Sequence, residues 1–115
     1  MRVIICDDEK STCAEVENML RDFAFEKCMK LEVDVFFDGT ALKREKAPDI
    51  LFLDIELPGM DGVEVGKYVR DILRNLHMFL VYISSKEEYA LELFQNQPFD
   101  FLIKPIKKER LYHVM

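Results

Sequence analysis

The sequence has no apolar run long enough for a membrane-spanning helix. Such a helix needs about 20 consecutive apolar residues, and no run in these 115 residues approaches that length. Met1 and Arg2 lead directly into a short apolar run, unlike the charged and then hydrophobic segments of a signal peptide. We therefore expect a cytoplasmic protein that neither enters a membrane nor carries an export signal.

Cysteines and basic residues are also too few for several functional classes. The three cysteines are an odd number without metal-site spacing. Cys13 and Cys28 fall on what reads as one helix, about 22 Å apart at 1.5 Å per residue, which is too far for a disulfide. Reduced thiols favour the cytoplasm. The net charge of -6 argues against direct binding to nucleic acid or an anionic membrane.

The most informative stretch that is present is the apolar run from Ile50 to Leu53. Pro48 bounds it on one side and Pro58-Gly59 on the other, so it reads as a strand buried on both faces. Asp54 follows directly. In a parallel sheet the carboxyl ends of the strands form the edge where ligands bind. An aspartate at this place can also simply cap the following turn.

Strand and helix patterns alternate along the whole chain, which lacks repeats and linkers and is long enough for one domain. Continuous apolar runs indicate interior strands at 3–6, 50–53 and 79–83, and clean alternation indicates an edge strand at 31–37. A fifth strand is predicted at 101–103. Helices are predicted at 12–28, 40–46, 65–76, 87–95 and 107–115, with Ser11 or Asp8 capping the first. This pattern predicts a doubly wound α/β fold, a five-stranded parallel sheet in the order 2-1-3-4-5 with a short final helix.

Three carboxylates are predicted to meet at one edge of this sheet. Asp7 and Asp8 follow the first strand, and Asp54 follows its neighbour, the third. Two unit charges 4 Å apart repel by about 4 kcal/mol at an effective dielectric near 20. Protonation or a bound cation must relieve that repulsion, and oxygen ligands select Mg²⁺ or Mn²⁺. One aspartate of the pair can cap the first helix as well, since capping does not exclude metal contact.

The fourth and fifth strands add a hydroxyl and an ammonium to the same edge. Ser84 ends the fourth strand and Lys104 ends the fifth. Together with a metal ion they would form a site for a group with anionic oxygens, with Lys104 neutralising its charge and Ser84 donating a hydrogen bond. Read singly, Ser84 is a strand end and Lys104 a surface charge.

These residues resemble the signature of bacterial response-regulator receiver domains. The match comprises Asp7-Asp8, Asp54, Ser84 and Lys104-Pro105, with intervals of 30 and 20 residues after Asp54 and Ser84, and the typical run from Leu57 to Gly62. It covers the whole chain, so 1–115 is interpreted as one receiver domain.

The resemblance implies a phosphoacceptor site. Asp54 would take a phosphoryl group from a sensor histidine kinase or a small phosphodonor, in a reaction that the domain itself catalyses, as it does the later dephosphorylation. Lys104 and Ser84 would contact the phosphoryl oxygens, with Ser84 replacing the more frequent threonine. Phe101 would be the aromatic switch residue that turns inward, and the Lys104–Pro105 peptide would be cis.

The resemblance also implies a metal site at the same edge. Asp8 and Asp54 would bind Mg²⁺ (or Mn²⁺) directly, Asp7 would act through water, and the backbone carbonyl of Glu56 would be a further ligand. The output would be a homodimer formed on phosphorylation through the helix at 87–95, the fifth strand and the final helix.

Two segments, 85–91 and 98–106, look like receivers of LytTR-type transcription regulators. Their output domain binds DNA and is absent from this chain, whose final helix is cut short. We therefore expect a fragment of a longer regulator that reaches DNA only through the missing domain and has no membrane partner.

Three alternatives belong to other classes. An FMN carrier of the flavodoxin type shares the strand order, but Asp7-Asp8-Glu9 would repel its phosphate. A haloacid-dehalogenase-type phosphatase needs a second aspartate where Glu56 stands. A receiver-like dimerisation module would act without phosphorylation.

Overall fold

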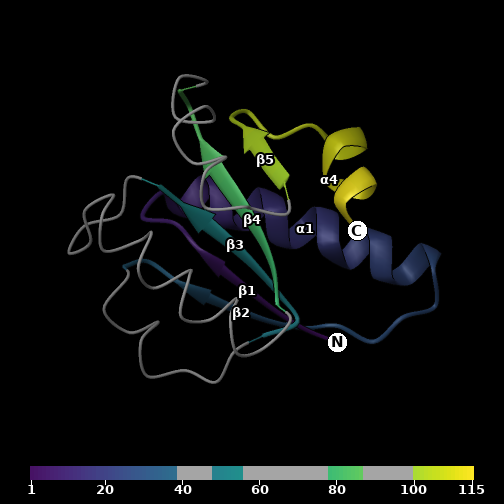
Figure 1. Ribbon diagram of the computed structural model, residues 1–115. Helices are drawn as coiled ribbons and strands as arrows, with labels where there is room; N and C mark the ends of the chain where they lie inside the picture. The colour runs from purple at the N-terminus through teal and green to yellow at the C-terminus, as the bar shows by residue number, and fades with distance from the viewer. Residues whose placement is uncertain (39–47, 56–77, 87–99) are drawn as a thin grey trace.

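Five parallel strands form one sheet in the order β2-β1-β3-β4-β5, as predicted (Figure 1). The computed structural model describes residues 1–38, 48–55, 78–86 and 100–115. The strands are β1 Arg2–Cys6, β2 Glu32–Phe36, β3 Ile50–Asp54, β4 Phe79–Ser84 and β5 Asp100–Ile103, and the helices are α1 Lys10–Glu26 and α4 Lys108–Val114. The helices predicted at 40–46, 65–76 and 87–95 lie outside the described residues.

The three interior strands bury side chains on both faces because their apolar runs are continuous. Every residue of β3 is buried, and so are the last four of β1 and the last five of β4. The pairing register sets Cys6 opposite Leu53, Asp54 opposite Ile83, and Ser84 opposite Ile103. The polar residues at the ends of these strands therefore lie at one edge of the sheet.

Helices α1 and α4 lie against the same face of the sheet (Figure 1). The 3.6-residue apolar period of α1 directs Val16 and Leu20 into this layer, and Leu111 of α4 joins them. They pack on strand residues of the same face, which are Val3, Ile5, Phe52, Val81 and Leu102. The opposite face holds a second buried cluster, including Ile4, Leu51, Leu53, Leu80 and Phe101. Neither described helix is long and apolar enough to cross a membrane.

The edge strand β2 follows its predicted alternation as far as Phe36 and departs from it at Phe37. Val33 and Val35 pack toward the α1 face, and Phe36 packs against the opposite cluster, as alternation requires. Phe37 is 46% exposed, with the Lys10 ammonium 5.4 Å from its ring centre. The strand ends at Phe36, so Phe37 has left the sheet and the period of two no longer places it inward.

Neither predicted cap begins α1. Glu9 occupies the N-cap position and makes no side-chain capping bond. The helix starts at Lys10, so Ser11 already lies inside its first turn and Asp8 lies just outside. The amide of Glu9 instead donates a 2.8 Å hydrogen bond to Asp7 Oδ1, which fixes the backbone at the entrance to the helix.

Cys28 lies beyond α1, so the prediction that it shares one helix with Cys13 was wrong. The helix ends at Glu26, and Cys28 follows with a φ of 54°. The Cys28 amide donates a hydrogen bond to the Phe25 carbonyl, and the Met29 amide donates one to the Ala24 carbonyl. These two bonds define a Schellman motif. The motif satisfies carbonyls at the end of the helix. All three cysteines are free thiols.

Replacing Cys28 with glycine is expected to raise the free energy of unfolding by roughly 1 kcal/mol, because a residue with a Cβ is disfavoured in the left-handed region. Cys28 is exposed, so no core contact is lost. Thermal unfolding would measure the change. Cys28→Ala is the matched control, since it removes the thiol, keeps the Cβ and should leave the midpoint unchanged. Equal midpoints for the two variants would contradict the backbone explanation.

Candidate functional site

Three aspartates gather where β1 and β3 end. Asp7 and Asp54 are buried, with exposed fractions of 0% and 4%, while Asp8 is exposed. One carboxylate oxygen from each lies within 4.8 Å of the others. Parallel neighbouring strands deliver them to the same edge, so the predicted convergence of the three carboxylates is confirmed.

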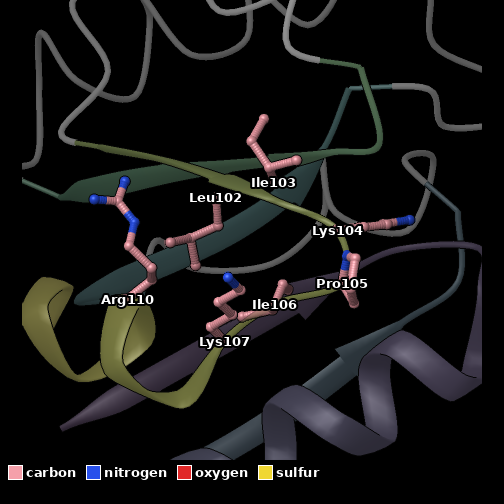
Figure 2. A pocket seen from close by; sticks show the side chains of 7 residues that line it. All are labelled: Leu102, Ile103, Lys104, Pro105, Ile106, Lys107 and Arg110. Atoms are coloured by element: carbon pink, nitrogen blue, oxygen red, sulfur yellow. The ribbon is translucent and has the colours of Figure 1, made fainter.

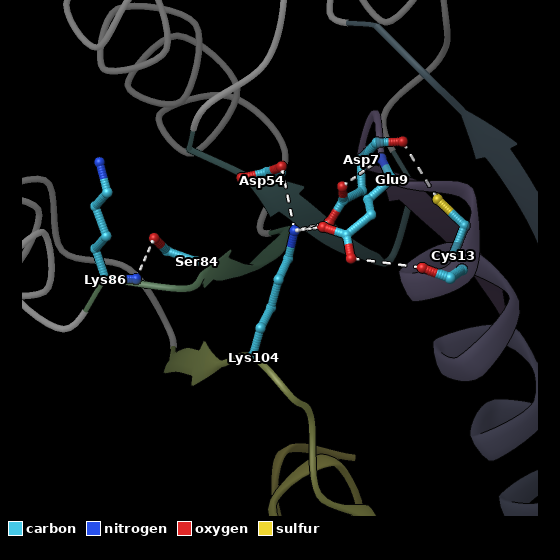
Figure 3. Close-up of polar contacts among 8 residues, drawn as sticks. Asp7, Glu9, Cys13, Asp54, Ser84, Lys86 and Lys104 are labelled. Carbon is cyan, nitrogen blue, oxygen red and sulfur yellow. Dashed lines mark hydrogen bonds and ion pairs between the residues drawn. The ribbon is translucent and has the colours of Figure 1, made fainter.

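Lys104 reaches this cluster from the end of β5 (Figure 3). Its ammonium lies 3.0 Å from Asp7 Oδ2 and 3.5 Å from Asp54 Oδ2. The backbone amide of Lys104 donates to the Ser84 carbonyl at 2.9 Å, which holds the start of the side chain against β4. The Lys104–Pro105 peptide is cis, as predicted.

The ammonium of Lys104 is the cation that these carboxylates share. Burial alone would lower its pKa, but contact with Asp7 and the charges of Asp54 and Glu9 together raise the pKa above the ordinary value for lysine. Lys104 therefore stays protonated across the physiological range of pH. Its charge offsets the mutual repulsion of the carboxylates.

Glu9 is a fourth carboxylate at the site, and the sequence pattern predicts no role for it. Its Oε2 accepts a hydrogen bond from Lys104 Nζ at 3.2 Å, although the glutamate side chain is 57% exposed. The bond to Lys104 and the lysine charge lower the pKa of Glu9. The only sequence signal was a third acidic residue directly after Asp7-Asp8.

Ser84 lies on the neighbouring strand but outside the ion-pair cluster. The side chain is buried, and its Oγ accepts a 3.0 Å hydrogen bond from the amide of Lys86 (Figure 3). A serine hydroxyl has one donor and two acceptor positions. The Lys86 bond uses an acceptor position, so the O–H remains able to donate to an oxygen of a bound group.

Phe101, the predicted switch residue, has its ring buried at 8% exposure in the cluster opposite α1. Its amide donates to Asp100 Oδ1 at 2.7 Å, and its carbonyl accepts a 3.5 Å bond from Arg110 of α4. The ring is thus already inward in this structure, and its role as a switch stays a prediction.

Two buried thiols flank the Asp7 segment. Cys13 Sγ donates to the Asp7 carbonyl at 3.3 Å. Burial raises the pKa of Cys13 to about 11 and that of Cys6 to about 12. Both thiols stay protonated at neutral pH, so they act as packing and hydrogen-bonding groups rather than as nucleophiles.

The aspartate cluster fits a hard divalent cation. Oxygen donors from three carboxylates suit Mg²⁺ or Mn²⁺ rather than a softer metal. Asp7 Oδ2 is buried and accepts no hydrogen bond from the described residues, although the Lys104 ammonium is near it. A buried carboxylate oxygen with a free acceptor position is a suitable ligand. The carbonyl of Glu56, the further predicted ligand, lies outside the described residues.

A hollow of about 340 Å³ lies beside the site, between β5 and the start of α4. Leu102, Ile103 and Ile106 supply its apolar lining, and Lys107 and Arg110 its charges. In Figure 2 the Lys104 side chain extends away from the other lining residues. The lining contains none of the three clustered aspartates and shares only Lys104 with the carboxylate site.

The family model of the response regulator receiver domain matches residues 3–115. The chain belongs to this family. Receiver domains are components of two-component systems, in which they interact with histidine kinases and output domains, and they generally bind Mg²⁺ at an acidic pocket.

Relatives and solved structures agree with this assignment. The chain is 35% identical over 69 residues to the sensory transduction protein LytT of Oceanobacillus iheyensis, covering 60% of this chain and 28% of the relative. It is 29% identical over 111 residues to the transcriptional regulatory protein BtsR of Escherichia coli, covering 96% and 45%. The crystal structure of the response regulatory domain of mrkE from Klebsiella pneumoniae superposes with a TM-score of 0.78 at 30% identity, covering 99% and 91%. The chain thus spans less than half of either curated relative.

Proposed function

We propose that Asp54 accepts a phosphoryl group from a sensor histidine kinase and that this receiver domain is thereby switched. The proposal rests on the environment of Asp54. This carboxylate is only 4% exposed, and two further aspartates and the Lys104 ammonium lie beside it. A structural aspartate at a strand end needs no such neighbours. The likeness to other receivers supports the same role.

The transfer is a displacement at phosphorus. An Asp54 oxygen attacks the phosphorus atom, the P–N bond of the phosphohistidine breaks, and the electron pair of that bond leaves with the imidazole, which takes up a proton. An oxygen of a small donor such as acetyl phosphate would leave in the same way. Lys104 would pair with the phosphoryl oxygens, and the free O–H of Ser84 would donate to one of them.

A divalent cation completes this arrangement. Asp8 and Asp54 would hold Mg²⁺ or Mn²⁺ directly, Asp7 through water, and the Glu56 carbonyl as a further ligand. Bound there, the ion would supply positive charge against the phosphoryl oxygens. Asp7 Oδ1 is already engaged by the Glu9 amide, and Oδ2, which lies 3.0 Å from Lys104 Nζ, accepts no hydrogen bond from the described residues.

The output is proposed to pass through Ser84 and Phe101. A shift of Ser84 toward a phosphoryl group would change the space beside the Phe101 ring, and so the dimer surface predicted for residues 87–95, β5 and α4. Homodimerisation through this surface would then control a DNA-binding output domain. Support comes from the relatives, which are longer than this chain and include a transcriptional regulator. Residues 1–115 would be the receiver part of such a cytoplasmic regulator.

Intact-mass measurement after incubation with acetyl phosphate and Mg²⁺ tests the proposal. The wild-type chain should gain about 80 Da, the mass of one phosphoryl group. Chelation by EDTA or Asp54→Asn should abolish the gain, because the nucleophile or its cation is lost. Asp22→Asn, which changes an exposed carboxylate of α1, is the matched control and should be phosphorylated normally. The same gain in Asp54→Asn would refute the assignment.

A further inference from the structure

The Lys104 ammonium is held by more than the carboxylates of the proposed phosphoacceptor site. It lies 3.0 Å from Asp7, 3.2 Å from Glu9 and 3.5 Å from Asp54, so Asp54 is the most distant of the three. Glu9 belongs neither to the aspartate cluster nor to the proposed metal ligands. Its contact with Lys104 therefore needs a separate explanation.

We infer that Glu9 is a positioning residue that shares Lys104 with Asp7 and Asp54 and retains part of its contact until a phosphoryl group is present. This inference rests on the proposed function, since it concerns the same lysine. An anionic group on Asp54 would draw the ammonium toward β3, and Lys104 would have to give up its bond to Glu9. Glu9 thus competes with the phosphoryl group for one cation.

The position of Glu9 suits a releasable contact. Its backbone is fixed at the N-cap of α1 by the bond from its amide to Asp7, and its Oε1 accepts a 3.4 Å bond from Ser11. The carboxylate itself is more than half exposed. A hollow of about 320 Å³ with Glu9 and Lys104 in its lining adjoins it, so the side chain can move aside without disturbing the core.

The size of the effect follows from this exposure. A charge pair open to solvent is weak, because water screens it and two long side chains lose freedom in making it. Glu9 should therefore weaken the binding of a phosphoryl mimic by about two- to five-fold, rather than block it. Such an effect adjusts the balance between the two states of a switch without abolishing either.

Binding of beryllofluoride, a mimic of the phosphoryl group, at saturating Mg²⁺ tests the inference by calorimetry. Glu9→Gln should bind about two- to five-fold more tightly than the wild type. Glu9→Asp keeps the charge but shortens the reach, so it should also bind more tightly. Glu15→Gln is the matched control, because Glu15 lines the same hollow and makes no ion pair with Lys104 among the described contacts. Its affinity should equal that of the wild type.

Repeating the Glu9→Gln measurement in a Lys104→Met variant distinguishes the direct Glu9–Lys104 contact from the long-range effect of the Glu9 charge. In Lys104→Met, beryllofluoride binding should weaken and Glu9→Gln should then have no further effect. Equal gains in both backgrounds, or equal gains for Glu9→Gln and Glu15→Gln, would overturn the inference. As a check independent of the Lys104 variant, the NMR signal of the Lys104 ammonium in the wild type should shift on Glu9→Gln. An unchanged signal would also overturn it.

The same binding measurements distinguish a wrong role for Glu9 from a wrong phosphoacceptor assignment. If the wild type and Glu15→Gln do not bind beryllofluoride, the phosphoacceptor assignment is wrong and the role of Glu9 is wrong with it. If both bind and Glu9→Gln binds equally well, only the role of Glu9 is wrong.

Discussion

Replacing Lys104 with methionine is expected to lower the free energy of unfolding by roughly 3 kcal/mol, the lower end for removing one partner of a buried ion pair. The lysine side chain is 14% exposed, and its ammonium lies between the buried carboxylates of Asp7 and Asp54. Methionine keeps most of the apolar stem, so charge is the main loss. Urea unfolding in the absence of divalent cations would measure the change.

Lys108→Met is the matched control for this experiment. Lys108 pairs with Glu26 at 3.9 Å, and both side chains are about half exposed, at 50% and 52%. Its loss should change stability by less than about 1 kcal/mol. Adding Asp54→Asn to Lys104→Met should restore part of the lost stability, because one of the repelling charges disappears. A fully stable Lys104→Met would show that the carboxylates do not depend on this cation.

Magnesium is expected to stabilise the wild-type domain strongly. At one hundred times the dissociation constant, a ligand that binds only the folded state adds about 2.7 kcal/mol. For a domain of this size that corresponds to a rise of roughly 10 °C in Tm. The physical reason is that the ion relieves the repulsion among Asp7, Asp8 and Asp54, which lie within 4.8 Å of one another. Differential scanning calorimetry with and without MgCl₂ would measure the rise.

Asp8→Asn should abolish most of that rise. Asp8 is exposed, and no described residue forms an ion pair with it, so its replacement removes a ligand without breaking the core. Asp22→Asn should retain the full rise, and sodium chloride at equal ionic strength should not produce it. A magnesium response that survives Asp8→Asn would place the ion elsewhere.

The strand order could be predicted because each class of strand has its own pattern. Continuous apolar runs marked β1, β3 and β4 as interior, and alternation marked β2 as an edge. The convergence of Asp7, Asp54 and Lys104 followed from the order, since parallel strands end at the same side. These features depend on periods and topology, which a sequence records directly.

Features that depend on where the backbone turns were harder to predict. The start of α1 at Lys10, the end of β2 at Phe36 and the turn at Cys28 each differ from the prediction by one or two residues. Such boundaries arise from competition between local hydrogen bonds of similar strength. The contact of Glu9 with Lys104 was missed for another reason, because it joins residues 95 positions apart through two flexible side chains.

Lys104 also stabilises the edge of the sheet formed by β5. Strand β5 has only four residues and pairs with β4 alone, so by itself it would open more readily than the interior. Its terminal side chain nevertheless reaches across to carboxylates carried by β3 and by the segment after β1. Local opening of the last strand and helix is thereby linked to the charge on Asp54. A modification that adds negative charge there would slow amide hydrogen exchange in β5, so the solvent protection of this edge would depend on the charge at Asp54.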